Sequence, residues 1–202
     1  MVKTMKAQKI QKFRNVLKKS CIGIAGLGGL GSNAAVSLAR VGVGRLVLVD
    51  FDRVEKSNLN RQYFFLDQVG MYKTEALKKN IERINPDIET IIHNIRLVKG
   101  LMDSPFRDVD IVIEALDDAS TKTDFIEEIL IKLPDTPLVA ASGVAGYGNS
   151  DRIHTMRSGN LYLCYDEQSL SSDEDVLTAP RVGLMANWEA NLAVEILLRC
   201  EQ

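Results

Sequence analysis

The chain has 202 residues, 46% of them hydrophobic, which is enough to bury the core of a single domain spanning residues 1–202. A formal net charge of −2 excludes the overall basic field that gathers nucleic-acid phosphates, so nucleic acid is not expected as the main partner. No apolar run is long enough for a membrane span and no signal-peptide pattern is present, which predicts a cytoplasmic protein that contacts no membrane.

The first predicted element is a basic helix over residues 1–19. Seven lysines and arginines fall between residues 3 and 19 with no acid among them, and Ile10, Phe13 and Leu17 recur at helical spacing. Such a charge pattern is typical of a solvated helix face. A second interpretation is that Arg14 reaches a phosphate, either in its own site or in that of a partner subunit.

Short apolar stretches then alternate with stretches of helical periodicity. Gly42 and Gly44 supply a helix stop and a turn, and Pro86 and Pro134 follow the ends of two later helices. In chain order, we predict a strand at 22–25, a helix at 32–41, a strand at 45–50, a helix at 71–84, strands at 90–95 and 110–115, a helix at 122–132 and a strand at 138–142. This order predicts a Rossmann-like α/β fold, with a mainly parallel sheet, helices on both faces and ligands at the carboxyl ends of the strands.

The last part of the chain departs from this alternation. Residues 152–157 and 160–164 are expected to form extra antiparallel strands, and residues 182–198 a final helix of small and apolar residues. Between them, the segment 166–178 is polar, acidic and without periodicity, so it is predicted to be a mobile crossing loop.

A glycine motif, Gly26-x-Gly28-x-x-Gly31, lies between a predicted strand and a predicted helix. In this context the first glycine permits a tight turn, the second lets backbone N–H groups approach a phosphate, and the third lets helix and strand pack closely. Asp50, at the end of the next strand, is placed to accept both ribose hydroxyls. Asp52 either supports that contact or caps the loop.

Polar and basic residues follow this acidic pair, and they indicate ATP chemistry rather than a dinucleotide dehydrogenase. The group consists of Asn58, Arg61 and Gln62. The guanidinium of Arg61 offers a planar fork of donors to phosphate oxygens, or else forms a salt bridge with one of the two acids. Lys73 opens the next helix, where its ammonium and the helix N-terminus would address the same anion, although a lone lysine there is more often solvated.

Two adjacent carboxylates, Asp117 and Asp118, follow the strand at 110–115. Magnesium prefers oxygen ligands and is commonly bound by carboxylates together with the phosphate oxygens of a nucleotide, so Asp117 is predicted to hold Mg²⁺. Asp118 or Ser120 is suited to cap the following helix.

Three cysteines, Cys21, Cys164 and Cys200, show no CxxC spacing, so no zinc site is expected. Cys164 is either a buried structural residue or a reactive thiol. With two histidines in the chain, a Ser-His-Asp site has no local support.

Four motifs resemble those of the ThiF/MoeB adenylyltransferases, the bacterial relatives of ubiquitin-activating enzymes: GLGGLGSN, LVDFDRVEKSNLNRQ, GMYKTEAL and LDDAST. The resemblance covers residues 14–198 and is closest to the short ThiF-like proteins that activate the sulfur carrier ThiS. It implies an enzyme that joins AMP from MgATP to the C-terminal glycine carboxylate of a ubiquitin-like carrier ending in Gly-Gly. A sulfur donor would then form the thiocarboxylate.

The same resemblance assigns roles by motif. The nucleotide-binding set that it implies is Gly26, Gly28, Gly29, Gly31, Asp50, Asp52, Asn58, Arg61 and Lys73. Catalysis would use Arg61 and Lys73 on the phosphates and Asp117 on magnesium. Family members are homodimers in which an arginine of an N-terminal helix enters the partner's ATP site, and Arg14 is the matching residue.

The chain also departs from the family. It lacks the two CxxC pairs with which many members bind zinc, and the segment 166–178 has no cysteine for a thioester, so we expect adenylation without zinc or a covalent thioester step. ThiS in thiamine biosynthesis is the expected carrier. Alternatives are the molybdopterin carrier, a tRNA-base carboxylate, and, from other classes, an NAD-dependent oxidoreductase or a non-catalytic nucleotide-binding scaffold.

Overall fold

The central strands bury side chains on both faces of the sheet, which is why helices cover both faces. In β2 (Arg45–Asp50), Leu46 and Leu48 pack into one hydrophobic cluster, whereas Val47 and Val49 pack into another. The computed structural model describes residues 2–148, 150–166 and 176–199. Strands with apolar side chains on both faces are the pattern expected of a buried parallel sheet.

Within these residues, one sheet has seven strands in the order β3-β2-β1-β4-β5-β7-β6. Every neighbouring pair is parallel except β6 and β7, which are antiparallel. The other strands are β1 (Cys21–Ala25), β3 (Glu89–Asn94), β4 (Ile111–Glu114), β5 (Leu138–Ser142), β6 (Ile153–Ser158) and β7 (Leu161–Asp166). The predicted Rossmann-like fold is confirmed, and so are the antiparallel strands near the C-terminus.

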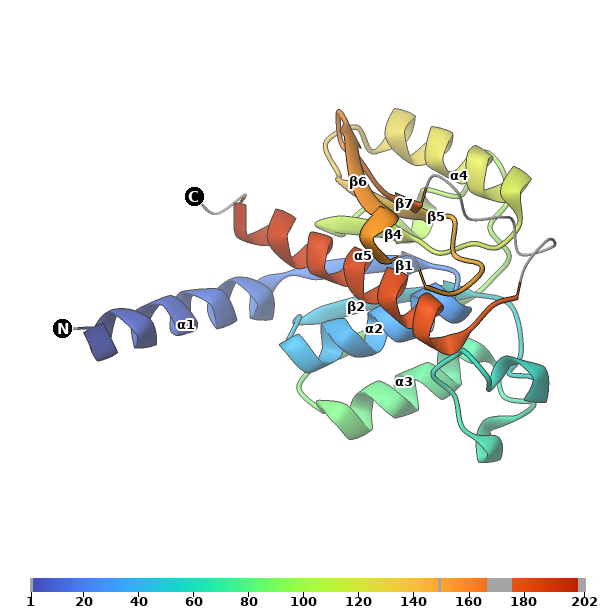
Figure 1. Ribbon diagram of the computed structural model, residues 1–202, viewed down its shortest axis with the longest axis horizontal. Helices are drawn as coiled ribbons and strands as arrows, with labels where there is room; N and C mark the ends of the chain where they lie inside the picture. Colours follow the sequence, from blue (N-terminus) through green and yellow to red (C-terminus); the bar gives the residue numbers. More distant parts are fainter. Residues whose placement is uncertain (1, 149, 167–175, 200–202) are drawn as a thin grey trace.

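The helices are divided between the two faces, as Figure 1 shows. Three of them share the larger hydrophobic cluster: α2 (Gly29–Val41), α3 (Lys73–Ile84) and α5 (Ala179–Arg199). On the other face, α4 (Ala119–Lys132) contributes Phe125 and Ile129, which pack with Phe106 from the short turn Ser104–Phe106. The rings of Phe106 and Phe125 meet edge to face with their centroids 5.6 Å apart.

Three helices begin three residues earlier than the sequence pattern predicts, namely α2, α4 and α5. Their first turns are made mostly of small, polar or proline residues, which suit the start of a helix but add little to its apolar stripe; Leu30 of α2, which is buried, is the exception. By contrast, α3 begins later than predicted, at Lys73, because Tyr72 is extended and pairs with Arg53 in an antiparallel bridge.

The N-terminal helix α1 (Val2–Lys19) projects from the body of the protein (Figure 1) and is fixed at its C-terminal end. Val16 and Leu17 are buried, and the Leu17 carbonyl accepts a 2.8 Å hydrogen bond from the N–H of Gly44. The N–H of Arg45, the first residue of β2, likewise donates to the Ser20 carbonyl at 3.0 Å. The helix is therefore attached at the amino end of β2, opposite the edge where the parallel strands end.

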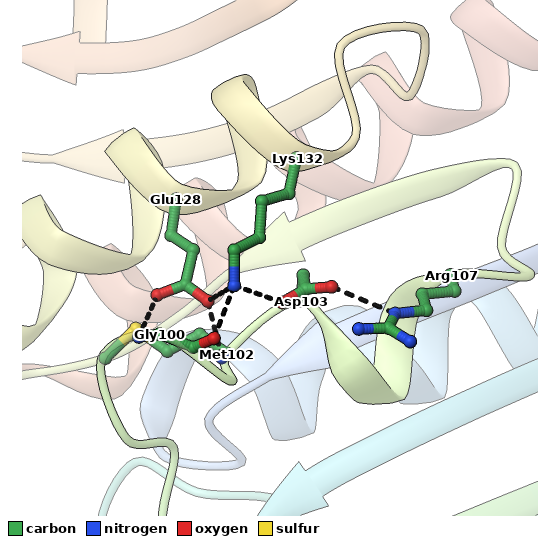
Figure 2. A network of polar contacts seen from close by, with 6 residues as sticks. All are labelled: Gly100, Met102, Asp103, Arg107, Glu128 and Lys132. Atoms are coloured by element: carbon green, nitrogen blue, oxygen red, sulfur yellow. Dashed lines mark hydrogen bonds and ion pairs between the residues drawn. The ribbon is translucent and has the colours of Figure 1, made fainter.

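Charged side chains fasten the connection between β3 and β4 to α4 (Figure 2). Lys132 donates to Glu128 and to Asp103 at 2.9 Å each, and Glu128 accepts the N–H groups of Gly100 at 2.6 Å and Met102 at 2.8 Å. Burial by itself would raise the pKa of Glu128, but these hydrogen bonds outweigh it and lower the pKa. The network therefore stabilises the fold at neutral pH, and this contribution is lost as the pH falls and the carboxylates protonate.

Cys200 and residues 167–175, which make up most of the predicted crossing loop, lie outside the described residues. Within the part that the structure describes, no helix combines the length and the apolar character needed to cross a membrane.

Candidate nucleotide-binding site

The candidate site lies where β1, β2 and β4 end side by side. The N–H of Gly26 donates to the carbonyl of Val49 at 2.9 Å, and the N–H of Ala115 donates to the carbonyl of Ala25 at 2.8 Å. The chain segments that leave these three strands carry the glycine motif, the acidic pair and the two aspartates after β4. The edge predicted to collect ligands thus contains the predicted site residues from all three segments.

Two of the glycines are required by close backbone packing. Gly26 has a φ of +88°, and an added Cβ atom would lie 2.6 Å from the carbonyl oxygen of Ala115. A Cβ atom at Gly31, in the first turn of α2, would lie 1.9 Å from the carbonyl oxygen of Gly26. The loop and the helix therefore fit together only without side chains at these positions.

Gly28 and Gly29, between these two glycines, have different surroundings. A Cβ atom at Gly29 would approach Val182 of α5 to 2.8 Å and the Cγ of Arg61 to 3.9 Å. At Gly28, the N-cap of α2, the nearest atom to an added Cβ is the Nε2 of Gln62 at 3.8 Å. Gly29 serves packing, whereas Gly28 stands where a phosphate could approach the N-terminus of α2.

Asp50 ends β2 and joins two loops of the site. Its Oδ2 accepts the N–H of Leu27 and its Oδ1 accepts the N–H of Asp52, both at 2.7 Å. The side chain is nearly buried, with Asp50 9% exposed. A carboxylate has about four lone-pair positions, so two remain for the ribose hydroxyls that the sequence assigns to it.

The ammonium of Lys73 is paired with Asp52 at 2.8 Å, and the backbone N–H of Lys73 donates to the Asp52 carbonyl at 2.9 Å. The Lys73 side chain is 8% exposed against 44% for Asp52. The interpretation of Lys73 as a solvated lysine is therefore wrong, because its position after the Arg53–Tyr72 bridge turns it inward. Sequence reasoning did not foresee this pairing of Asp52.

Arg61 lies against the glycine loop through its aliphatic stem. Its guanidinium donates to the carbonyl of Ser57 at 3.2 Å and to the Oδ1 of Asn60 at 2.8 Å, which leaves further N–H groups of the fork for an anion. The alternative salt bridge with the acidic pair is absent from the part of the chain that the structure describes.

Asn33 ties this segment to the helix, and sequence reasoning missed it. Its amide nitrogen donates to the carbonyls of Gly29 at 2.7 Å and Arg61 at 2.9 Å. The neighbouring Ser32 hydroxyl accepts the N–H of Tyr63 at 3.0 Å. A polar pair so early in a helix was the available signal, since such residues often bond to backbone groups of another segment.

Asn58 closes the short turn Lys56–Asn58, and its Oδ1 accepts the N–H of Glu55 at 3.0 Å. The amide therefore shapes the turn that precedes Arg61. Its predicted contact with phosphates stays a prediction.

Of the two candidates for the cap of α4, Asp118 and Ser120, the structure selects Asp118. Asp118 caps α4, since its Oδ1 accepts the N–H of Thr121 at 2.7 Å and the Thr121 hydroxyl at 2.6 Å. These hydrogen bonds from Thr121 lower the pKa of Asp118. Asp117 is exposed beside this cap.

The carboxylate of Asp117 suits a magnesium ion whose other ligands are phosphate oxygens of a nucleotide. Mg²⁺ is commonly held by one or two carboxylates together with substrate oxygens, and Asp117 supplies such a carboxylate. Among the described residues, no group of three or more His, Cys, Asp or Glu side chains could hold a metal ion by itself. Asp117 would therefore hold Mg²⁺ together with phosphate oxygens of the nucleotide.

Cys164 lies on β7 in the core rather than at the site. Burial raises the pKa of this thiol far above its ordinary value. The structure therefore favours the interpretation of Cys164 as a structural residue over that of a reactive thiol.

Arg14 is exposed on α1, which attaches at the opposite edge of the sheet. The structure does not bring Arg14 to the site of its own chain.

Comparison with known proteins gives the following matches. The ThiF family profile matches residues 4–202. The sulfur carrier protein ThiS adenylyltransferase of Escherichia coli (strain K12) is 33% identical over 180 residues, which cover 86% of this chain and 70% of that protein. The tRNA threonylcarbamoyladenosine dehydratase of Bacillus subtilis (strain 168) is 39% identical over 131 residues, covering 64% of this chain and 51% of that protein.

Among solved structures, the E. coli tRNA N6-threonylcarbamoyladenosine dehydratase in complex with ATP has a TM-score of 0.86, covering 95% of this chain and 90% of that chain. At 21% sequence identity, this match shows that the two proteins share a fold. The chain spans only 44% and 42% of the length of two other curated relatives that it matches.

Proposed function

Because the chain belongs to the ThiF family, we propose that it is an adenylyltransferase that transfers AMP from ATP to a carboxylate and releases pyrophosphate. The observation that carries this proposal is a pair of cations on the chain that follows β2 and Asp50. Arg61 lies against Gly29, and Lys73 is paired with Asp52 directly after β2. A hydride-transfer site has no need for two such cations beside the nucleotide phosphates.

The chemistry brings one anion to another. A carboxylate oxygen attacks the α-phosphorus, the new oxygen–phosphorus bond forms, and the bond to the pyrophosphate oxygen breaks. Arg61 and Lys73 would offset the negative charge that the two reactants bring together, and Asp50 would orient the ribose. No general base is required, because the attacking carboxylate is already ionised. Magnesium, held by Asp117 and the phosphates, would supply further charge neutralisation.

For the substrate, we propose the C-terminal glycine carboxylate of a ubiquitin-like sulfur carrier, and ThiS of thiamine biosynthesis as that carrier. The similarity to the E. coli ThiS adenylyltransferase over most of both chains supports this choice. The similarity to the B. subtilis tRNA threonylcarbamoyladenosine dehydratase supports a tRNA-base carboxylate as the alternative. The molybdopterin carrier stays a third acceptor for the same chemistry.

The acceptor can be identified by ATP–pyrophosphate exchange. We expect exchange to appear when a purified ThiS-type carrier ending in Gly-Gly is added, and to disappear when the carrier lacks its last glycine. Asp117→Ala should abolish the exchange, while wild-type chain with total tRNA in place of the carrier gives none. Exchange with tRNA alone would establish the alternative acceptor. No exchange with any carrier or tRNA, together with tight binding of NAD, would refute the adenylation proposal.

We also propose that the chain acts as a homodimer in which Arg14 completes the partner's site. The α1 helix carries seven lysines and arginines and no acid, whereas the whole sequence has 25 basic and 27 acidic side chains. The rest of the chain thus has 18 basic against 27 acidic residues, so the basic helix of one copy suits the body of another. Attachment of α1 at the far edge of the sheet keeps Arg14 away from the site of its own chain, which supports a role in a partner's site.

Mixing two inactive variants tests this arrangement. An Arg14→Ala subunit retains Lys73, and a Lys73→Ala subunit retains Arg14, so each mixed dimer contains one complete site. Random pairing is expected to restore up to about a quarter of the wild-type exchange activity. Each variant mixed with itself is the control. Failure of the mixture to regain activity, when mixed dimers are shown to form, would contradict the proposed role of Arg14.

A further inference from the structure

Behind the turn between β4 and α4 lie three ionisable side chains from three different elements. Glu114 ends β4, Lys122 lies in the first turns of α4, and Glu189 lies in the middle of α5. Both glutamates have no exposed side-chain surface or almost none, whereas the Lys122 side chain is 21% exposed. None of the three takes part directly in the proposed reaction.

Glu114 is held on both of its carboxylate oxygens. The ammonium of Lys122 forms an ion pair with Oε2, and Oε1 accepts the backbone N–H of Leu116 at 2.7 Å. Leu116 directly precedes the two aspartates, so the second bond fixes the start of the turn that carries Asp117. Lys122 in turn fixes the carboxylate that makes this bond.

Glu189 has no comparable support. Within the described residues, neither of its carboxyl oxygens has a hydrogen-bond partner, although the residue is fully buried. The charged and titratable groups that face it are Lys122 from α4, Glu114 from β4 and the thiol of Cys164 from β7. Two buried carboxyls therefore share one ammonium.

Charge balance decides which carboxyl is ionised. Burying two anions against one cation would leave one charge uncompensated, so one of the carboxyls binds a proton. Glu114 has two donors and Glu189 has none, which assigns the proton to Glu189. Burial raises the pKa of both carboxyls. For Glu114 the Lys122 ammonium and the Leu116 N–H oppose this, whereas the pKa of Glu189 is raised well above its ordinary 4.5, with Lys122 opposing this and Glu114 adding to it.

We propose that Lys122 is a positioning residue for the nucleotide site, because it holds the turn at residues 116–118 in place through Glu114. Glu189 is protonated and therefore does not compete with Glu114 for the Lys122 ammonium. The proposal rests on the proposed function, because the turn is taken to present Asp117 to the nucleotide. Lys122 acts through Glu114 and touches no substrate. If Glu189 ionised, it would compete with Glu114 for the ammonium and loosen the turn.

Substitution of Lys122 tests the positioning role with two readouts. Lys122→Met is expected to weaken binding of a fluorescent ATP analogue about 10-fold and to speed hydrogen exchange at the Leu116 amide. Lys122→Arg should restore both. The matched control is Lys132→Met on the same helix, which breaks the network of Figure 2 and should lower the melting temperature without affecting either readout.

The outcomes separate the inference from the function on which it rests. If the wild-type chain binds no ATP analogue, the proposed function fails, and exchange at Leu116 still reports on the support of the turn. If Lys122→Met leaves both readouts as in the wild type, the positioning role is refuted.

Glu189→Gln tests the protonation state and does not disturb the ion pair. Glutamine resembles the protonated carboxyl, so at pH 7 the variant should keep the wild-type ATP affinity and Leu116 exchange. Because the pKa of Glu189 in the folded protein is raised above 4.5, the wild type should lose stability as the pH rises from 4.5 toward that raised pKa. The glutamine variant should lack this loss, so its relative melting temperature rises with pH. Weaker ATP binding or faster Leu116 exchange in Glu189→Gln at pH 7 would refute the proposal.

Discussion

Replacing Lys73 by methionine is expected to lower carrier-dependent ATP–pyrophosphate exchange by about 10²- to 10³-fold, the usual effect of removing one preorganised donor to a developing anion. The substitution also leaves the carboxylate of Asp52 beside the phosphates without its 2.8 Å partner. Because the Asp52 side chain is 44% exposed, water can hydrate it and the fold should survive. Thermal unfolding within a few degrees of the wild type would confirm that the loss is one of chemistry.

The matched control for this experiment is Lys79→Met, which removes an exposed lysine from the same helix. Its exchange rate should stay within about twofold of the wild type, as is usual for surface substitutions away from a site. Equal activity of the Lys73 and Lys79 variants would show that the ammonium of Lys73 has no role at the phosphates.

The second large effect is expected from alanine substitutions at two glycines of the glycine motif, Gly31 and Gly28. Gly31→Ala places a Cβ atom 1.9 Å from the carbonyl oxygen of Gly26, so loop and helix must separate, at a cost of about 3 kcal/mol or more in the free energy of unfolding. Gly28→Ala meets nothing nearer than 3.8 Å, and its φ of −75° lies outside the left-handed region that requires glycine. Its stability should change by less than about 1 kcal/mol.

The affinity for ATP should be affected more by Gly28→Ala than by Gly31→Ala, the reverse of the order expected for stability. The added methyl group of Gly28→Ala would occupy the approach of a phosphate to α2, so affinity should fall about 10-fold or more, equivalent to about 1.4 kcal/mol. Thermal unfolding with and without ATP measures both quantities in one experiment. A Gly28→Ala protein stabilised by ATP as strongly as the wild type would show that no phosphate lies at this glycine.

The parts of the fold that could be predicted from the sequence are those governed by local patterns. The order of strands and helices follows from apolar periodicity, and the antiparallel pairing of β6 with β7 follows from the short segment between them. The parallel pairing of β5 with β7, which inserts β7 between β5 and β6, is not local and could not be read from the sequence. Strand order in such cases depends on contacts that no window of sequence contains.

The site shows the same division. The glycine loop and Asp50 could be located because a motif fixes their spacing relative to a strand end. The inward orientation of Lys73 depends on an antiparallel bridge between Arg53 and Tyr72 in an irregular connection, for which the sequence offers no periodicity. Asn33 was missed for a related reason, since its two acceptors are backbone carbonyls and any residue type supplies those.

The two hydrogen bonds of Asp50 have a thermodynamic consequence. One carboxylate joins the glycine loop to the segment after β2, so the two chain segments that would enclose a nucleotide are already held together before it arrives. The conformational entropy of ordering them is lost during folding and not during binding, which leaves more of the contact energy to appear as affinity. Nucleotide binding should consequently cause little reorganisation of the backbone around the ribose.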